Sequence, residues 1–436
     1  MPKSIYKKIK RNFLILLSGR AVSALLQLVS TVIAARILSP KDLGYIAILY
    51  AYIFLIRGLL SVKPFEAMVR YGSKHLDTNS KELLGNLAWN CFKLDILSSI
   101  LGLIISMIGI NFLCAYGLLS YEYMIEGYFF CLILLFCNDG TAVGALRIWN
   151  KFNTISYCLI AGALVKLISL SILYSTNLTS FQAVAAVWTG SAIIQYVLLQ
   201  FNGWKHLRKL NSHKKVFKGN FSSCSAQNPG IWRFLHIVYW QSSLDLLPKR
   251  GSIILSGFFL GAETAALFRI ASDLSGFLSK PALLIRQVIF PDLSRLSDSK
   301  KVKESLKIAS KTSVATITPA LILTGITVIL GEEIIRATAG DFYAQASTLL
   351  TVLIFSATFE LAASPYRPLL YSIDKAYLAL TSQVIGSVFY AITFLTTYKT
   401  LIQLTPGIAN FVLQISTLIV TLFFILKWKK KLSENC

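Results

Sequence analysis

The chain has 436 residues, of which 55% are hydrophobic and 14% charged, and its net charge is +23. A soluble domain carries roughly a quarter charged residues, so this composition argues against a soluble protein. It predicts a polytopic membrane protein, because each crossing of the bilayer takes about 20 mostly apolar residues.

Apolar stretches of that length recur along the chain, separated by short polar segments. The start of the chain is basic and runs into an apolar stretch, but Arg20 interrupts this stretch and no small-residue cleavage site follows. We therefore expect a retained first helix rather than a signal peptide. In chain order, hydropathy predicts twelve spans near residues 13–35, 43–62, 86–112, 127–147, 154–174, 181–201, 233–257, 266–290, 313–335, 346–366, 377–397 and 405–426.

The basic residues lie mostly in alternate loops. With loops assigned to alternate sides, one side carries about 30 Lys and Arg and the other about 4. Basic loops face the cytoplasm, so both termini are predicted to be cytoplasmic. A large positive charge in a soluble protein would suggest nucleic acid, but this alternation indicates membrane topology instead.

A weak internal repeat at an offset of about 222 to 224 residues divides the spans into two halves, as transporters built from repeated bundles do. Arg36-Ile-Leu-Ser-Pro-Lys-Asp-Leu-Gly-Tyr lies against Phe258-Phe-Leu-Gly-Ala-Glu-Thr-Ala-Ala-Leu, and Phe65-Glu-Ala-Met-Val-Arg against Phe290-Pro-Asp-Leu-Ser-Arg. The predicted fold is all-α, with twelve transmembrane helices in two parallel six-helix lobes. The predicted domains are an N-terminal lobe (1–201), a basic cytoplasmic linker (202–232) and a C-terminal lobe (233–436).

Ionisable residues within the spans are the candidates for function. A charge at the bilayer centre costs about 2.5 kcal/mol or more and normally faces a bundle interior or water. The basic residues outnumber the acidic ones, which predicts a wet, cationic cavity. The candidate cations are Arg20, Arg57, Lys249, Arg250, Arg269 and Lys280, and the acids include Asp139, Asp245, Asp273 and Glu360.

Helical spacing leaves two interpretations of these charges open. Asp245 with Lys249, and Arg269 with Asp273, are i,i+4 pairs that could simply neutralise each other. Arg20 has no acid within helical reach on its own span and is the best single candidate for substrate contact. An anion-binding cavity suggests a phosphate or diphosphate group, which suits the planar fork of arginine. No nucleotide loop, hydrolase motif or metal-ligand spacing is found, so no enzyme activity, metal or cofactor is predicted.

Several segments resemble the Wzx-type flippases of O-antigen or capsule repeat units, which belong to the multidrug/oligosaccharidyl-lipid/polysaccharide exporter superfamily. The resemblance covers nearly the whole chain. The segments are Ala34-Ala-Arg-Ile-Leu-Ser-Pro-Lys-Asp-Leu-Gly-Tyr, Phe259-Leu-Gly-Ala-Glu, Phe290-Pro-Asp-Leu-Ser-Arg-Leu and Gly340-Asp-Phe-Tyr-Ala-Gln-Ala.

The resemblance implies alternating access around a central cavity in the bacterial cytoplasmic membrane. The implied substrate is an undecaprenyl-diphosphate-linked oligosaccharide, with membrane lipid and the polysaccharide polymerase machinery as further candidate partners. The cavity cations would hold the diphosphate, and Asp273, Glu360, Asp245 or Asp139 would carry a coupled cation. The alternative is a multidrug or organic-cation exporter of the same fold, although cationic drugs would favour an anionic cavity.

Overall fold

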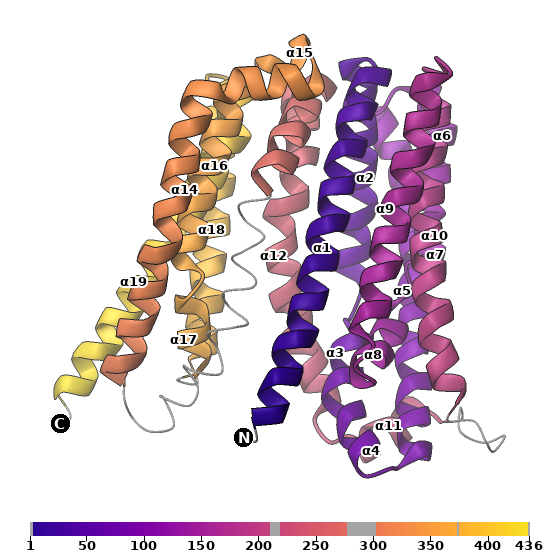
Figure 1. Ribbon diagram of the computed structural model, residues 1–436, viewed down its shortest axis with the longest axis vertical. Coiled ribbons are helices and arrows are strands. Elements are labelled where there is room, and N and C mark those ends of the chain that lie inside the picture. Colours follow the sequence, from indigo (N-terminus) through magenta and orange to yellow (C-terminus); the bar gives the residue numbers. More distant parts are fainter. Residues whose placement is uncertain (1–2, 210–218, 277–301, 373–374, 435–436) are drawn as a thin grey trace. The chain divides into compact units, whose positions relative to one another are not determined.

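The computed structural model describes residues 3–209, 219–276, 302–372 and 375–434, and all regular secondary structure in these ranges is helical (Figure 1). The all-α prediction is therefore confirmed. The chain forms two compact units, which are described separately. Unit 1 comprises Met1–Ser39 and Ile48–Leu246, and unit 2 comprises Pro40–Ala47 and Leu247–Cys436.

Unit 1 is a bundle of long apolar helices, which satisfy their backbone hydrogen bonds internally as a membrane span must. Its long helices are α1 (Lys3–Ile37), α2 (Pro40–Leu60), α5 (Lys81–Ala115), α9 (Phe152–Ser175), α10 (Phe181–Arg208) and α12 (Ile231–Leu260), of which α2 begins and α12 ends in unit 2. The short elements are α3 (Pro64–Ala67), the π-helix η1 (Met68–Gly72), α4 (Ser73–Asp77), the 3-10 helix η2 (Tyr121–Tyr123) and α11 (Phe221–Gln227).

The fourth predicted span is broken into three helices. These are α6 (Met124–Cys131), α7 (Ile133–Phe136) and α8 (Gly140–Ile148). Cys137, Asn138 and Asp139 lie between α7 and α8, outside any helix. Irregular backbone at membrane depth is tolerated only where it is buried in protein or lines a cavity. This break therefore marks a place where other side chains must satisfy the backbone.

Small residues allow α1 to run close along α9 (Figure 1). A Cβ added to Gly19 would lie 2.3 Å from the Cβ of Ser156, so only glycine fits at this crossing. Higher along the pair, the Ser23 hydroxyl donates to the Leu159 carbonyl at 3.2 Å. At the start of α10, the side chain of Ser180 caps the helix by accepting from the amide of Ala183 at 3.2 Å.

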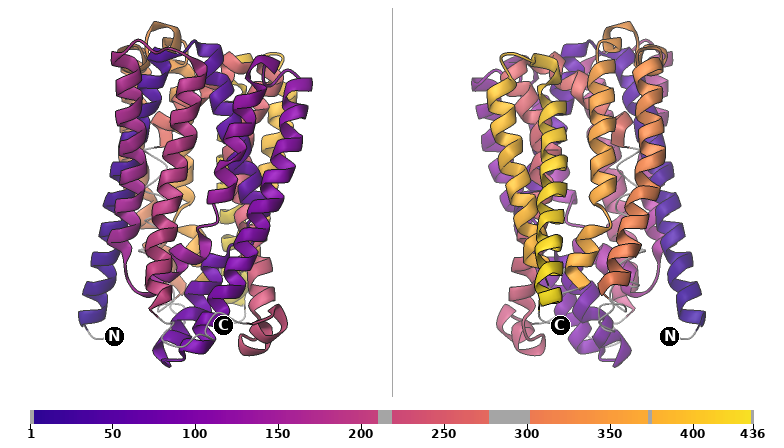
Figure 2. Two further views of the ribbon diagram at one scale, coloured as in Figure 1. Left: turned by 90° about the vertical axis from the view of Figure 1, so that its right-hand side faces the viewer. Right: turned by 90° about the vertical axis from the view of Figure 1, so that its left-hand side faces the viewer.

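Unit 2 is a second helical bundle, in which α18 and α19 lie side by side (Figure 2). Pro319 lies inside its longest helix, and Gly340 takes a φ of 107° at the turn that follows this helix. The elements are a helical segment over 262–276, α14 (Val302–Ala339), α15 (Asp341–Ala344), α16 (Ser347–Ala363), α17 (Tyr366–Ser372), α18 (Ala376–Thr397), the 3-10 helix η3 (Ile402–Leu404) and α19 (Thr405–Glu434).

Ten helical stretches in the described part are long and apolar enough to cross a membrane, if the broken stretch Tyr121–Ile148 is counted as one. They overlap predicted spans one to six and nine to twelve. Predicted span seven overlaps the shorter apolar stretch Arg250–Leu260 of α12. Predicted span eight begins in the 262–276 helix and continues into 277–290, which lie outside the described residues. The division into lobes 1–201 and 233–436 around a linker stays a prediction.

Candidate functional site

Arg57 is the centre of a charge network inside unit 1. Its guanidinium forms an ion pair with the carboxylate of Asp139. Nε and Nη2 donate to the Cys137 carbonyl at 3.3 and 3.2 Å, and Nη1 donates to the Tyr196 hydroxyl at 3.1 Å. The break between α7 and α8 supplies two of these partners and α10 supplies the third. One arginine therefore satisfies the interrupted backbone and connects α2 to two other elements.

Aromatic rings surround the same guanidinium. Its central carbon lies 4.8 Å from the centroid of the Tyr196 ring and 5.9 Å from that of Phe54. Such contacts stabilise a cation where water is scarce. Because Asp139, Cys137 and Tyr196 already occupy its donors, Arg57 is well placed to hold the local fold. Its contact with substrate stays a prediction.

Asp95 on α5 is a second buried acid beside this network. Its Oδ2 accepts from the amide and the hydroxyl of Thr141, both at 2.7 Å, in the first turn of α8. A helix N-terminus favours a carboxylate in this position. Gly140 permits the approach, since a Cβ there would lie 2.6 Å from Oδ1 of Asp95. The charges of both Asp95 and Asp139 act on Arg57.

Arg147 on α8 extends the network toward α1, where Arg20 is exposed on the surface of unit 1. The positive charge of Arg147 interacts with that of Arg20 and with the acids Glu66 and Asp139. The guanidinium lies 4.8 Å from the centroid of the Phe65 ring. Its Nε is buried and has no hydrogen-bond partner. The charges of two arginines on different helices thus act on each other, and one of these arginines has an unused donor.

Arg147 was missed by the sequence reasoning. It stands at the predicted end of span four, where a basic residue is ordinarily counted with the loop. Only the packing of α8 against α3 and η1 brings it inside the bundle. The repeated segment beginning at Phe65 was a signal in the sequence, because Phe65 and Glu66 both contact or interact with Arg147.

Two ionisable groups next to the network, between α2 and α4, have perturbed pKa values. Burial raises the pKa of Glu66, against the opposing effect of the Arg147 charge. Burial, followed by repulsion from Arg57, lowers the pKa of Lys63 to about 8. The Lys63 ammonium donates to the Gly58 carbonyl at 3.2 Å. Lys63 can therefore change its protonation near neutral pH.

A small cavity adjoins the network. Its volume is about 60 Å³, and Phe54 and Tyr196 line both the cavity and the guanidinium of Arg57. Lys166 on α9 also lines it, is 8% exposed, and has its ammonium 3.2 Å from the centroid of the Trp188 ring. With the amides of Gln27 and Gln195 in its wall, the cavity is polar enough for a few water molecules.

The remaining predicted residues, on α12 and in the later helices of unit 2, lie apart from this network in the sequence and are described by themselves. Arg269 and Asp273 form an ion pair one turn apart, with Nε 2.8 Å from Oδ2, which is the neutralising arrangement. Arg250 on α12 and Glu360 on α16 are partly buried. Lys280 falls outside the described residues, as do the side chains of Asp245 and Lys249 on α12. In the part of the chain that is described, no group of three or more His, Cys, Asp or Glu could hold a metal ion.

Comparison with known proteins identifies a family and a fold. Residues 9–297 match the model of a family described as polysaccharide biosynthesis protein. The inner membrane protein YghQ of Escherichia coli (strain K12) is 24% identical over 297 residues, which are 67% of this chain and 81% of that protein.

Two solved structures show the same fold over nearly the full length. An inward-facing MATE-family multidrug resistance transporter of the MOP superfamily matches with a TM-score of 0.74 at 14% identity, covering 96% of this chain and 99% of that one. The lipid II flippase MurJ, in an inward closed conformation, matches with a TM-score of 0.70 at 14% identity, covering 94% and 87%. At such identities the likeness concerns the fold alone.

Proposed function

Because this chain belongs to the polysaccharide biosynthesis protein family and has the fold of MOP-superfamily transporters, we propose that it is a flippase for a lipid-linked oligosaccharide. The family and the fold make it a multi-pass membrane transporter and not an enzyme. The proposed substrate is an undecaprenyl-diphosphate-linked repeat unit, which would cross the inner membrane before polymerisation into O-antigen, capsule or exopolysaccharide.

The observation that carries this proposal is the unpaired, buried Nε of Arg147, whose guanidinium charge also interacts with that of Arg20. Two like charges repel each other, and the partial burial of Arg147 limits the screening of this repulsion by water. An anion between them would remove that cost. Arginine forks bind phosphate oxygens in pairs, and the buried Nε of Arg147 has a donor to offer. A diphosphate headgroup has the charge and geometry that this pair requires.

The neighbouring network supports the same proposal by separating two roles. Arg57, paired with Asp139, holds α2 against the broken span. Arg20 and Arg147 are left to contact the headgroup. The proposal includes twelve spans in two six-helix lobes, with both termini in the cytoplasm. It also includes cation antiport, for which Asp139, Asp245, Asp273 and Glu360 are the candidate coupling residues.

Deletion of the gene in its host tests the function. We expect loss of surface polysaccharide and accumulation of complete lipid-linked repeat units on the cytoplasmic face of the membrane. Normal surface polysaccharide in a deletion strain without a second flippase would contradict the proposal. Unchanged polysaccharide combined with increased sensitivity to cationic drugs would favour the exporter that shares this fold.

Complementation of that strain tests the two arginines. Arg147→Ala and Arg20→Ala should each reduce polysaccharide display by tenfold or more if a charge-assisted contact of about 1.5–3 kcal/mol is lost. Arg147→Lys should retain part of the activity, because it keeps the charge but loses the fork. Arg336→Ala, which removes an exposed arginine from α14, is the matched control and should complement fully.

A further inference from the structure

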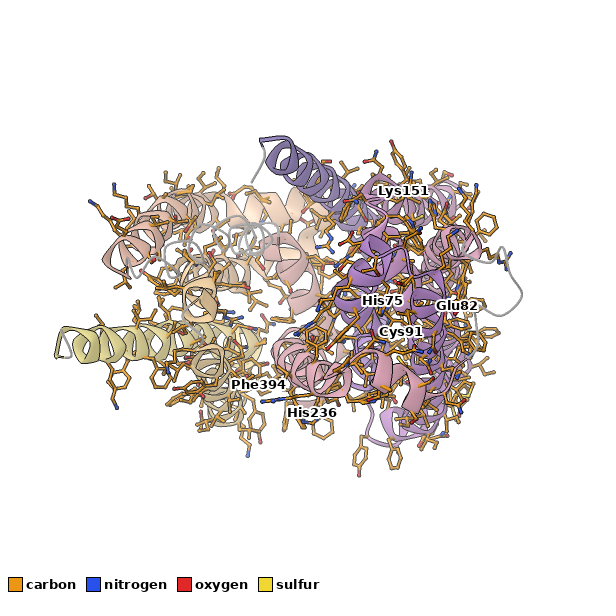
Figure 3. The ribbon with its side chains drawn as sticks, turned by 90° about the horizontal axis from the view of Figure 1, so that it is seen from below. His75, Glu82, Cys91, Lys151, His236 and Phe394 are labelled. Carbon is orange, nitrogen blue, oxygen red and sulfur yellow. The ribbon has the colours of Figure 1, made fainter. Side chains whose placement is uncertain are left out.

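A basic pocket of about 400 Å³ lies at the end of unit 1 where α1 begins, and it shares no residue with the Arg57 network. It lies where α4, the start of α5, the turn between α8 and α9, and the last turn of α10 come together. Figure 3 views unit 1 from this end and labels His75 and Lys151. Five basic side chains line the pocket: His75, Lys81, Lys151, His206 and Lys209.

Two tight turns set the backbone positions of Lys81 and Lys151. Asn79 and Asn150 both have a left-handed backbone, with φ of 51° and 56°. The first turn is closed by a hydrogen bond from the amide of Ser80 to the carbonyl of His75 at 2.9 Å. The second is closed by the amide of Lys151, which donates to the carbonyl of Leu146 at 2.7 Å. The pocket therefore has walls that are set by backbone geometry.

The two imidazoles are also held in place. The Nε2 of His75 lies 2.8 Å from Oδ1 of Asn228, a residue that is 1% exposed in the connection between α11 and α12. The Nδ1 of His206 lies 3.0 Å from the carbonyl oxygen of Asn202 on α10. The Trp149 ring lies with its centroid 6.1 Å from that of His206. Both imidazoles thus lie beside polar groups of Asn228 and Asn202, which are outside the pocket lining.

The charge of the lining favours an anion. Asp77 and Glu82 are exposed neighbours in sequence, but among the described residues that line the pocket none is acidic. The 35-residue helix α5 begins here, and its N-cap, Ser80, makes no side-chain capping hydrogen bond. The positive end of the helix dipole at that first turn adds to the attraction for negative charge.

The rest of the lining is apolar, because Leu76, Leu84 and Trp149 form the remaining wall. Free phosphate would gain nothing from this surface, whereas the glycerol and first methylene groups of a lipid would cover it. Basic pockets between the ends of membrane helices bind anionic headgroups, and this end of unit 1 is the one predicted to face the cytoplasm. We propose that the pocket binds the phosphate headgroup of an anionic membrane lipid, separately from the transported substrate.

The consequence is a lipid that connects three segments of unit 1. A ligand that binds only the folded state stabilises it by RT ln(1 + c/Kd), where c is the ligand concentration, so the stabilisation grows with c relative to Kd. The headgroup would bridge Lys81 at the start of α5, Lys151 between α8 and α9, and Lys209 after α10. Anionic lipid should therefore raise the unfolding temperature of the full-length protein, and neutral lipid should not.

Native mass spectrometry of the full-length protein in a neutral detergent tests the proposal, with dioctanoyl phosphatidylglycerol as the probe. We expect binding of this lipid with little binding of dioctanoyl phosphatidylcholine or glycerol phosphate. A triple variant that removes the three charges should weaken binding by about tenfold or more. It consists of Lys81→Gln, Lys151→Gln and Lys209→Gln.

A control triple variant removes the same charge from exposed positions at the same end of unit 1, outside the pocket. It consists of Lys74→Gln, Lys205→Gln and Arg208→Gln. Binding to the control should stay within about twofold of the parent, as electrostatic attraction falls off with distance from the bound group. Substituting the three pocket lysines by arginine should preserve binding, which separates loss of charge from misfolding.

Three results would overturn the proposal. Equal weakening in the pocket and control variants would indicate a diffuse basic surface. Equal binding of phosphatidylcholine would show that the headgroup charge is not recognised. Equally tight binding of glycerol phosphate would show that the apolar wall takes no part and that the ligand is a soluble phosphate.

Discussion

The two units differ in how polar side chains connect their helices. In unit 1, Arg57 bonds to Asp139, Cys137 and Tyr196 on two other elements, so charged contacts run between helices. In unit 2, the ion pairs Arg269–Asp273 and Arg336–Glu332 each join residues one turn apart. Arg336 also pairs with the exposed Asp341 of the adjoining α15 at 3.3 Å, and Arg367 donates to a neutral amide, that of Gln383 on α18. A charge that connects helices affects tertiary structure, whereas a pair within one turn chiefly supports its own helix.

Neutral groups provide a deeply buried connection between helices in unit 2. The Tyr390 hydroxyl on α18 donates to Oγ of Ser252 on α12 at 2.7 Å, and Nδ2 of Asn410 on α19 approaches the same oxygen at 3.5 Å. Ser252 is fully buried. Burying a neutral hydrogen-bonded pair costs less desolvation free energy than burying an ion pair. The difference indicates that unit 1 keeps a costly charge network where its fourth span is broken.

Loss of Asp139 should have the largest effect on stability. Asp139→Ala leaves the Arg57 charge largely buried without its counter-ion, at a cost of about 3–5 kcal/mol. Thermal unfolding of the purified protein measures this change. The double variant Arg57→Leu with Asp139→Ala should be more stable than Asp139→Ala alone, because the unpaired charge is gone. If the single and double variants are equally unstable, the unpaired charge of Arg57 is not the reason for the loss of stability.

Loss of the Thr141 hydroxyl should have the next largest effect. Thr141→Val removes one of the two hydrogen bonds to the Asp95 carboxylate, at about 1.5–3 kcal/mol for a bond to a charged group. Thr358→Val in unit 2 is the matched control, since its buried hydroxyl donates to the neutral Ile354 carbonyl at 3.1 Å. This control should cost about 1 kcal/mol or less. Equal unfolding temperatures for the two variants would remove the distinction between the units.

The exposed ion pair of unit 2 should matter less. Glu332→Gln removes one of the two acidic partners of Arg336, the other being Asp341, and the side chains of Glu332 and Arg336 are about half exposed. Exposed pairs one turn apart contribute about 0.3–0.5 kcal/mol, so the unfolding temperature should barely change. A fall in the unfolding temperature as large as that caused by Asp139→Ala would show that charges within one helix also support tertiary structure here.

Lys63 gives an effect of another kind, visible as a dependence of stability on pH. Burial and Arg57 lower its pKa to about 8 in the folded protein, whereas the unfolded chain keeps the ordinary value near 10.4. Below pH 8 both states are protonated, and the penalty for a partly buried charge is present in full. As the pH rises from 8 to about 10, the folded state loses this proton first, so this group adds stability.

The comparison of the parent with Lys63→Met measures this contribution. Between pH 7 and pH 10 the unfolding temperature of the parent should rise relative to that of the variant by about 1–2 °C. An unchanged difference across this range would mean that Lys63 does not titrate differently in the folded protein.

Much of the fold followed from periodicity and hydropathy. Apolar stretches of span length predicted the helices because a membrane segment must satisfy its own backbone, and ten of these helices are long and apolar enough to cross a membrane. Span ends were less accurate. The helix of the third predicted span, α5, starts at Lys81 rather than near residue 86, since a helix can continue past the apolar stretch into polar surroundings.

The site could be predicted only in part. Arg57 and Asp139 were recognised as charges inside spans, but 82 positions separate them in the chain, and nothing local indicated that they pair. The pairing of Arg269 with Asp273 was one of two open interpretations and is observed, because contacts at i,i+4 depend on one helix alone.

The sequence alone determined that this is an all-α membrane protein with an excess of basic residues, because hydropathy and charge are local properties of the chain. The tertiary structure decided which charges act together. The break between α7 and α8 turned the Cys137 carbonyl toward Arg57, and the packing of α8 brought Arg147 near Arg20. Such contacts depend on how distant helices pack against each other, which no window of sequence contains.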